Sequence, residues 1–162
     1  MKPIQSILIA NRSEISIRVM RAAAETGIRT VAIYSTEDRF ALHRFKADES
    51  YLVDAKKKPI QAYLDIDDII RIAKQAEVDA IHPGYGFLSE NPDFADACAK
   101  NGIVFIGPKP DVMRLLGNKV AARELAQTAG IAVVPATGAL PQDIKQAKKL
   151  ADKIGYTLLL KA

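Results

Sequence analysis

The sequence predicts an α/β fold built on a parallel sheet. Short runs of β-branched residues alternate with segments in which apolar residues recur at helical spacing. Such alternation is typical of strands joined by crossover helices, which makes the strands parallel and places helices on both faces. With 162 residues, 49% of them hydrophobic, the chain is long and apolar enough to bury a core.

Five apolar runs are the candidate strands of this sheet. Each is short and consists mainly of β-branched, aromatic or other apolar residues. The runs are residues 7–9, 30–34, 51–53, 80–81 and 103–106.

Helices are predicted between these strands. The first begins at Asn11, three residues before Glu14 in capping-box spacing, or has Ser13 as its cap, and it ends near Gly27. Two more helices are predicted over residues 65–76 and 92–100. Together these elements predict a Rossmann-like, doubly wound domain.

The pattern changes after residue 108, and we place a domain boundary near residue 115, between residues 1–114 and residues 115–162. Because the chain ends inside a predicted strand, we expect it to be truncated. The elements predicted in this second part are helices over residues 110–116, 118–129 and 141–153 and a strand over residues 157–161, with the apolar pair Val133-Val134 between the second and third helices.

Composition argues against several classes of protein. The net charge is +4, but the basic residues are dispersed and only 6% of residues are aromatic, which disfavours nucleic-acid binding. No apolar run approaches the length that spans a bilayer, and the first residues leave no room for a signal or transit segment, so we expect a cytoplasmic protein. The single cysteine, Cys98, is interpreted as a small buried apolar side chain.

The first β-α turn, Ala10-Asn11-Arg12-Ser13, contains no glycine. A dinucleotide-binding domain carries its glycine-rich phosphate loop at this place, so that the backbone can approach a pyrophosphate. The sequence therefore predicts the fold without that cofactor.

A decapeptide, His82-Pro83-Gly84-Tyr85-Gly86-Phe87-Leu88-Ser89-Glu90-Asn91, follows the fourth predicted strand. Open α/β sheets bind ligands at the carboxyl ends of their strands, which makes this loop a candidate site. The alternative is a tight turn in which Tyr85 and Phe87 merely pack and His82 is a structural, hydrogen-bonded histidine.

The decapeptide resembles a signature of biotin carboxylases, and the resemblance extends over nearly the whole chain. Other segments with the same resemblance are residues 7–12, 14–19, 30–35, 38–39, 105–108 and 116–119. Residues 42–51 and 59–64 look most like those of pyruvate carboxylases, and acetyl-CoA and propionyl-CoA carboxylases usually differ there. Two positions depart from the family: Ser13 stands where many relatives have glycine, and Thr157 stands where proline is common.

The resemblance implies an ATP-grasp enzyme preceded by a Rossmann-like domain. Such enzymes use Mg-ATP to activate bicarbonate through carboxyphosphate and then carboxylate biotin on a carrier domain, and a carboxyltransferase passes the carboxyl group to an acceptor. The ATP lid, the Mg²⁺ ligands and the bicarbonate-binding residues are expected beyond residue 162. We therefore expect no catalytic residue in these 162 residues and no activity from them alone.

Seven residues receive roles from the resemblance. Lys119 and Lys161 match lysines that contact ATP. Tyr85, Gly86 and His82 match residues at or near the biotin site, and Arg18 and Arg21 match a homodimer surface. Lys161 also follows Leu158-Leu159-Leu160 in a strand expected to be buried, where a charge needs an anionic partner. For Arg21 the alternative is an ion pair with Glu25, four residues on.

Three other interpretations stay open at this point. The chain could belong to an acetyl-CoA or propionyl-CoA carboxylase, or to another ATP-grasp ligase such as a carbamoyl-phosphate synthetase. A third possibility is a non-catalytic module that keeps the fold for dimer contacts alone, against which the presence of both Lys119 and Lys161 argues.

Overall fold

The structure is a computed structural model that describes residues 3–138 and 140–159. The chain folds into two compact units, Met1–Arg114 and Leu115–Ala162.

The first unit contains one five-stranded sheet in which every pairing is parallel. The strands lie in the order β3-β2-β1-β4-β5, so β1 is central. Their bounds are β1 Ser6–Ile9, β2 Arg29–Tyr34, β3 Glu49–Leu52, β4 Ala80–His82 and β5 Val104–Phe105. The predicted parallel α/β sheet is confirmed, and all five strands lie within two residues of their predicted positions.

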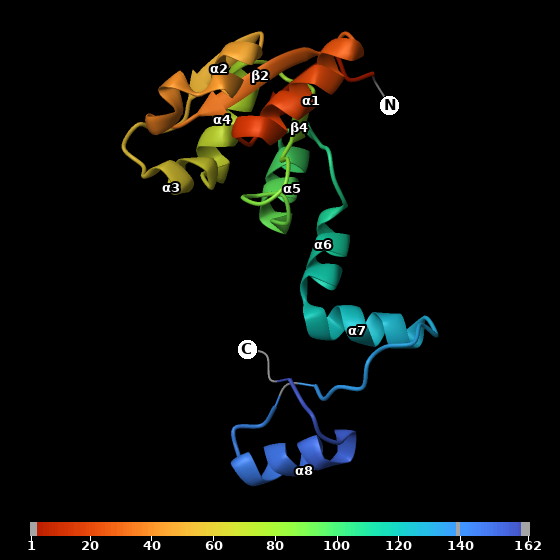
Figure 1. Ribbon diagram of the computed structural model, residues 1–162. Helices are drawn as coiled ribbons and strands as arrows, with labels where there is room; N and C mark the ends of the chain where they lie inside the picture. Colours follow the sequence, from red (N-terminus) through yellow and green to blue (C-terminus); the bar gives the residue numbers. More distant parts are fainter. Residues whose placement is uncertain (1–2, 139, 160–162) are drawn as a thin grey trace. The chain divides into compact units, whose positions relative to one another are not determined.

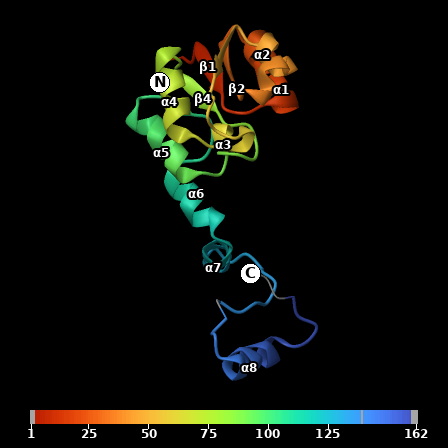
Figure 2. The same cartoon turned by 90° about the vertical axis from the view of Figure 1, so that its left-hand side faces the viewer.

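Helices cover both faces of this sheet. Figure 2 shows α1 and α2 on one side of the strands and α4 and α5 on the other. The helical elements of the first unit, in chain order, are α1 Ser13–Glu25, the 3₁₀ turn η1 Glu37–Phe40, α2 Leu42–Lys46, α3 Pro59–Tyr63, α4 Ile66–Gln75 and α5 Pro92–Lys100.

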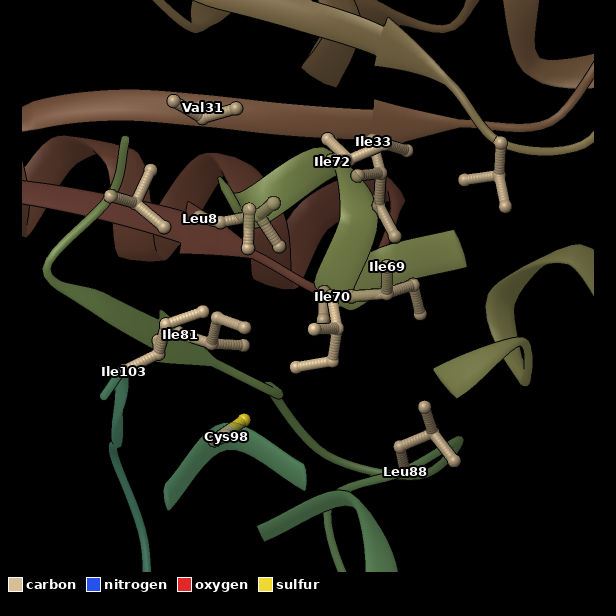
Figure 3. Close-up of a cluster of buried hydrophobic side chains, with 14 of the residues drawn as sticks. Leu8, Val31, Ile33, Ile69, Ile70, Ile72, Ile81, Leu88, Cys98 and Ile103 are labelled. Carbon is tan, nitrogen blue, oxygen red and sulfur yellow. The ribbon is translucent and has the colours of Figure 1, made fainter. Parts of the chain in front are cut away.

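Two apolar cores follow from the alternation of side chains along the strands. Leu8 of β1 and Ile81 of β4 pack with Ile72 of α4 and Cys98 of α5 on one face (Figure 3). The neighbouring residues of β1 point the other way, and Ile9 packs there with a small cluster that includes Met20 of α1. Cys98 is fully buried, as predicted.

The second unit contains helices but no strand among its described residues. The helix α6 Pro110–Gly117 carries the boundary between the units, and α7 Lys119–Thr128 and α8 Ile144–Ile154 follow (Figure 1). The apolar pair Val133-Val134 has no regular structure, and Val134 is 83% exposed. No described helix is both long enough and apolar enough to cross a membrane.

Candidate functional site

The candidate site lies where the connections of the sheet change direction. The chain leaves β1 toward β2 on one side, whereas β4 lies on the other side of β1. In open α/β sheets this switch point opens a crevice at the carboxyl ends of the two strands. Here the segment that follows β1 meets the loop that follows β4, and the backbone N–H of Ala10 donates to the carbonyl of His82 at 2.9 Å.

Asn11 fills this switch point. Its Nδ2 donates to the carbonyl oxygens of Pro83 and Tyr85, both at 2.8 Å, and its Oδ1 accepts from the backbone N–H of Arg12. Only 3% of the residue is exposed. The position at which a dinucleotide fold approaches a pyrophosphate is therefore occupied by a side chain.

The capping prediction for the first helix was wrong. The N-cap of α1 is Arg12, and no side chain of the cap accepts a hydrogen bond from the helix. The Oδ1 of Asn11, the group that would cap a helix, accepts from the N–H of Arg12 instead, while its Nδ2 is held across the switch point. Ser13, the first residue of α1, has a φ of 57°, in the left-handed region that glycine adopts most easily.

The loop after β4 turns sharply. Gly84, Gly86 and Phe87 all have positive φ angles. Phe87 turns inward and stacks on Tyr63 at 5.2 Å between ring centroids, and the next residue, Leu88, is 2% exposed. The inward side chains anchor the loop to the core.

Tyr85 and Gly86 face outward from this loop. Tyr85 is 62% exposed, so it does not merely pack, and its hydroxyl donates to the carboxylate of Glu14. That hydrogen bond raises the pKa of Tyr85. A Cβ added at Gly86 would meet no atom within 4 Å. The loop therefore presents an exposed aromatic ring next to uncovered backbone.

His82 takes part in the turn itself. Its Nδ1 accepts a hydrogen bond from the backbone N–H of Gly84 at 2.9 Å, and burial lowers the pKa of the imidazole. This contact is the one expected of a structural histidine.

A polar cluster that the sequence did not predict lies at the same edge of the sheet. Asp38 accepts from the hydroxyl of Tyr63 at 2.7 Å and from the Arg12 guanidinium at 3.1 Å. Burial raises the pKa of Asp38, but these two hydrogen bonds outweigh it, so the pKa lies below its ordinary value. The sequence does carry one signal for this cluster: Asp38 comes shortly after the predicted strand at residues 30–34, and the residues that follow parallel strands meet at one edge of the sheet.

The two predicted ATP-binding lysines belong to the second unit. Lys119 is the first residue of α7 and is exposed, and Asn118 caps this helix by accepting from the N–H groups of Val120 and Ala121. Lys161 lies outside the described residues. The expected burial of its strand was wrong for the described part, because Leu159 is 80% exposed and the described part of this unit holds no strand for residues 157–159 to pair with.

Arg18 and Arg21 are exposed on α1. Within the described part of the chain neither forms an ion pair, so the alternative pairing of Arg21 with Glu25 is not made. Nor do the described residues bring three potential metal ligands together.

Comparison with known proteins identifies the family of the first unit. The family model "Biotin carboxylase, N-terminal domain" matches residues 3–113. Among curated relatives, the human mitochondrial pyruvate carboxylase is 53% identical over 99% of this chain, and the pyruvate carboxylase of Bacillus subtilis is 54% identical over 98%. The chain spans about 14% of the length of each of these relatives.

Solved structures have the same fold. A pyruvate carboxylase of Rhizobium etli, determined with the allosteric activator acetyl coenzyme A, is 61% identical with a TM-score of 0.91, over 95% of this chain and 15% of that one. The biotin carboxylase domain dimer of a Hydrogenobacter thermophilus 2-oxoglutarate carboxylase, in complex with MgADP, ADP and bicarbonate, is 42% identical with a TM-score of 0.90, over 96% of this chain and 34% of that one. Because the family model covers more than half of the chain and the relatives match it over nearly all of its length, the chain belongs to the biotin carboxylase N-terminal domain family.

Proposed function

We propose that this chain is part of a biotin carboxylase unit that carboxylates carrier-bound biotin with ATP and bicarbonate. This is the first half-reaction of a biotin-dependent carboxylase, and we propose pyruvate as the final acceptor. The observation that carries the proposal is the 61% identity to a pyruvate carboxylase over 95% of the chain. The similar structure bound to ADP and bicarbonate supports ATP and bicarbonate as the substrates of this half-reaction, because ADP is what remains of ATP after phosphoryl transfer.

Two groups of residues would serve this reaction. Tyr85 and Gly86 would lie beside the ureido ring of biotin, with His82 holding the turn behind them. Lys119 and Lys161 would contact ATP, since a compact ammonium with three donors offsets the charge on phosphate oxygens. Mg²⁺ would neutralise charge on the same phosphates, with its ligands expected beyond residue 162.

The proposed partners are a biotin carboxyl carrier domain and a carboxyltransferase domain. A homodimer through α1 is a further part of the proposal, because Arg18 and Arg21 present two exposed charges on one helix face. The second unit is proposed to be the beginning of an ATP-grasp domain. A cytoplasmic location stays a prediction.

The test is bicarbonate-dependent ATP hydrolysis by the complete natural polypeptide, with and without free biotin. We expect biotin to stimulate hydrolysis, and we expect Lys119→Gln and Lys161→Gln each to abolish most of it. Lys100→Gln, at the exposed end of α5, is the matched control and should change little. Hydrolysis at the same rate with and without biotin would favour another ATP-grasp ligase. The absence of hydrolysis would favour a non-catalytic module.

The acceptor is tested separately. The same polypeptide is supplied with labelled bicarbonate and either pyruvate or 2-oxoglutarate, and the label fixed in acid-stable product is counted. Fixation with pyruvate alone supports the proposed acceptor, whereas fixation with 2-oxoglutarate alone contradicts it.

A further inference from the structure

We propose that Asn11 and Glu14 are positioning residues, which hold the loop over residues 83–87 in the conformation that presents Tyr85 and Gly86 to biotin. The inference rests on the proposed function, because it assumes that this loop meets biotin. Asn11 lies in the connection from β1 to α1, and Glu14 is the second residue of α1; each is more than 70 residues from its partner in the loop along the chain.

The loop needs ties from outside itself. Three of its residues, Gly84, Gly86 and Phe87, have positive φ angles, and Phe87 is not a glycine. Left-handed conformations persist in non-glycine residues only where surrounding contacts enforce them. Internal bonds close the far side of the loop, where the N–H of Ser89 donates to the carbonyl of Gly86 at 2.9 Å.

Asn11 supplies the tie on the near side. The two hydrogens of its Nδ2 reach the carbonyls on either side of Gly84, those of Pro83 and Tyr85. A primary amide is suited to this task because one nitrogen carries two donors, whereas a carboxylate carries none. Asn11 lies so close to Gly84 that only glycine fits at that position without a shift, since a Cβ at Gly84 would lie 2.6 Å from Nδ2 of Asn11.

Glu14 ties the outward side chain. Its carboxylate accepts from the hydroxyl of Tyr85, whose ring is otherwise exposed. Exposed polar contacts of this kind add little to stability. Its effect is to limit the positions open to the Tyr85 ring, so that the ring is oriented before biotin arrives.

The first experiment uses Glu14, because Glu14→Ala changes an exposed residue and leaves the core intact. In the complete natural polypeptide we expect the KM for free biotin to rise by about 3- to 10-fold in Glu14→Ala and in Tyr85→Phe, as one hydrogen bond allows, with the KM for ATP unchanged. The double variant should be no worse than the more affected single variant, because both changes remove the same contact. Glu14→Gln keeps an acceptor and should recover most of the loss.

Glu37→Ala is the matched control, because Glu37 is exposed at the same edge of the sheet. It should leave the KM for biotin unchanged. Unchanged KM values in both Glu14→Ala and Tyr85→Phe, in a wild type that responds to biotin, would overturn the role of Glu14.

The second experiment tests Asn11 without turnover, by hydrogen exchange followed by mass spectrometry. Asn11→Ala should accelerate exchange of peptides that cover residues 83–91 in the complete polypeptide, while peptides from α4 stay protected. Asn101→Ala is the control, because the Asn101 side chain only donates to the carbonyl of Ala97 within α5. Unaltered exchange in the loop would refute the tie. If the wild type showed no response to biotin, the proposed function would be wrong. The exchange measurement would still show whether Asn11 holds the loop, because it does not depend on turnover.

Discussion

At the scale of single residues, Asn11 decides what the carboxyl edge of the sheet can hold. A Rossmann-like sheet normally leaves room at its switch point for a ligand. In this chain the amide of Asn11 spans that room and bonds both sides of Gly84. Under the proposed function, ligand contact would fall on the outer surface of the loop, where Tyr85 is exposed, and not in the crevice.

Gly84 and Gly86 give a matched pair that separates crowding from backbone strain. Their φ angles are 67° and 65°, but only Gly84 is pressed against Asn11. Gly86→Ala should lower the free energy of unfolding by about 1 kcal/mol, the cost of the left-handed conformation. Gly84→Ala should cost about 2–4 kcal/mol, because displacement of the buried amide adds to that strain. Urea unfolding of the two variants measures the difference, and equal losses would contradict the close contact.

Ser13 offers the opposite change. Its φ of 57° is costly for a residue with a side chain. Ser13→Gly should therefore raise the free energy of unfolding by about 0.5–1 kcal/mol, even though glycine also makes the unfolded chain more flexible. A shift of the urea midpoint measures it, and Ser89→Gly, at a serine without a positive φ, serves as control. A lower free energy of unfolding in Ser13→Gly would show that the positive φ of Ser13 does not strain the backbone.

Residue types were easier to predict than residue contacts. The decapeptide could be singled out because its composition and its place after a strand are local properties of the sequence. The partners Asn11 and Glu14 could not, because they meet the loop only after β1 and β4 pair. The same holds for Asp38 and Tyr63, which lie 25 residues apart along the chain.

At the scale of elements, the decapeptide serves two purposes. Its first part forms the loop, and its last residue, Asn91, is the N-cap of α5, accepting from the N–H groups of Asp93 and Phe94. Pro92 occupies the first turn, where a missing N–H costs nothing. One segment therefore fixes both the candidate site and the helix that supports it.

Removal of the α5 cap should be measurable. Asn91→Ala leaves two N–H groups without their acceptor and should lower the free energy of unfolding by about 1 kcal/mol. Asn101→Ala, at the other end of the same helix, is exposed and should cost less. The comparison is made by thermal unfolding, and equal shifts in Tm for the two variants would argue against the cap.

The strands of the first unit were predicted well, whereas the strand predicted for the second unit is not formed by its described residues, 157–159. In β1 the side chains alternate between two buried cores, so the apolar pattern and the pairing agree. Residues 133–134 have the same β-branched composition, but a strand requires a neighbour to complete its hydrogen bonds. No described residue of the second unit provides one.

At the scale of the whole molecule, burial is concentrated in the first unit. No described residue from Leu115 onward is buried, whereas the first unit holds both apolar cores. We therefore expect residues 115–159 of the isolated chain to exchange amide hydrogens much faster than β1, β2 and β4, since local opening costs little where few contacts are lost. Hydrogen exchange by mass spectrometry tests this, and uniformly strong protection across both units would refute it.

The central position of β1 affects the order in which the sheet can fold during synthesis. Its pairing with β2 can form once β2 has left the ribosome, but its other edge stays open until β4, some 70 residues after β1, has been synthesised. Pairings between segments distant in sequence are slow to form, and an unpaired strand edge can form hydrogen bonds with non-native strands. Asn11 bonds to residues 72 and 74 positions later, so the candidate site is among the last features of the nascent sheet to take shape.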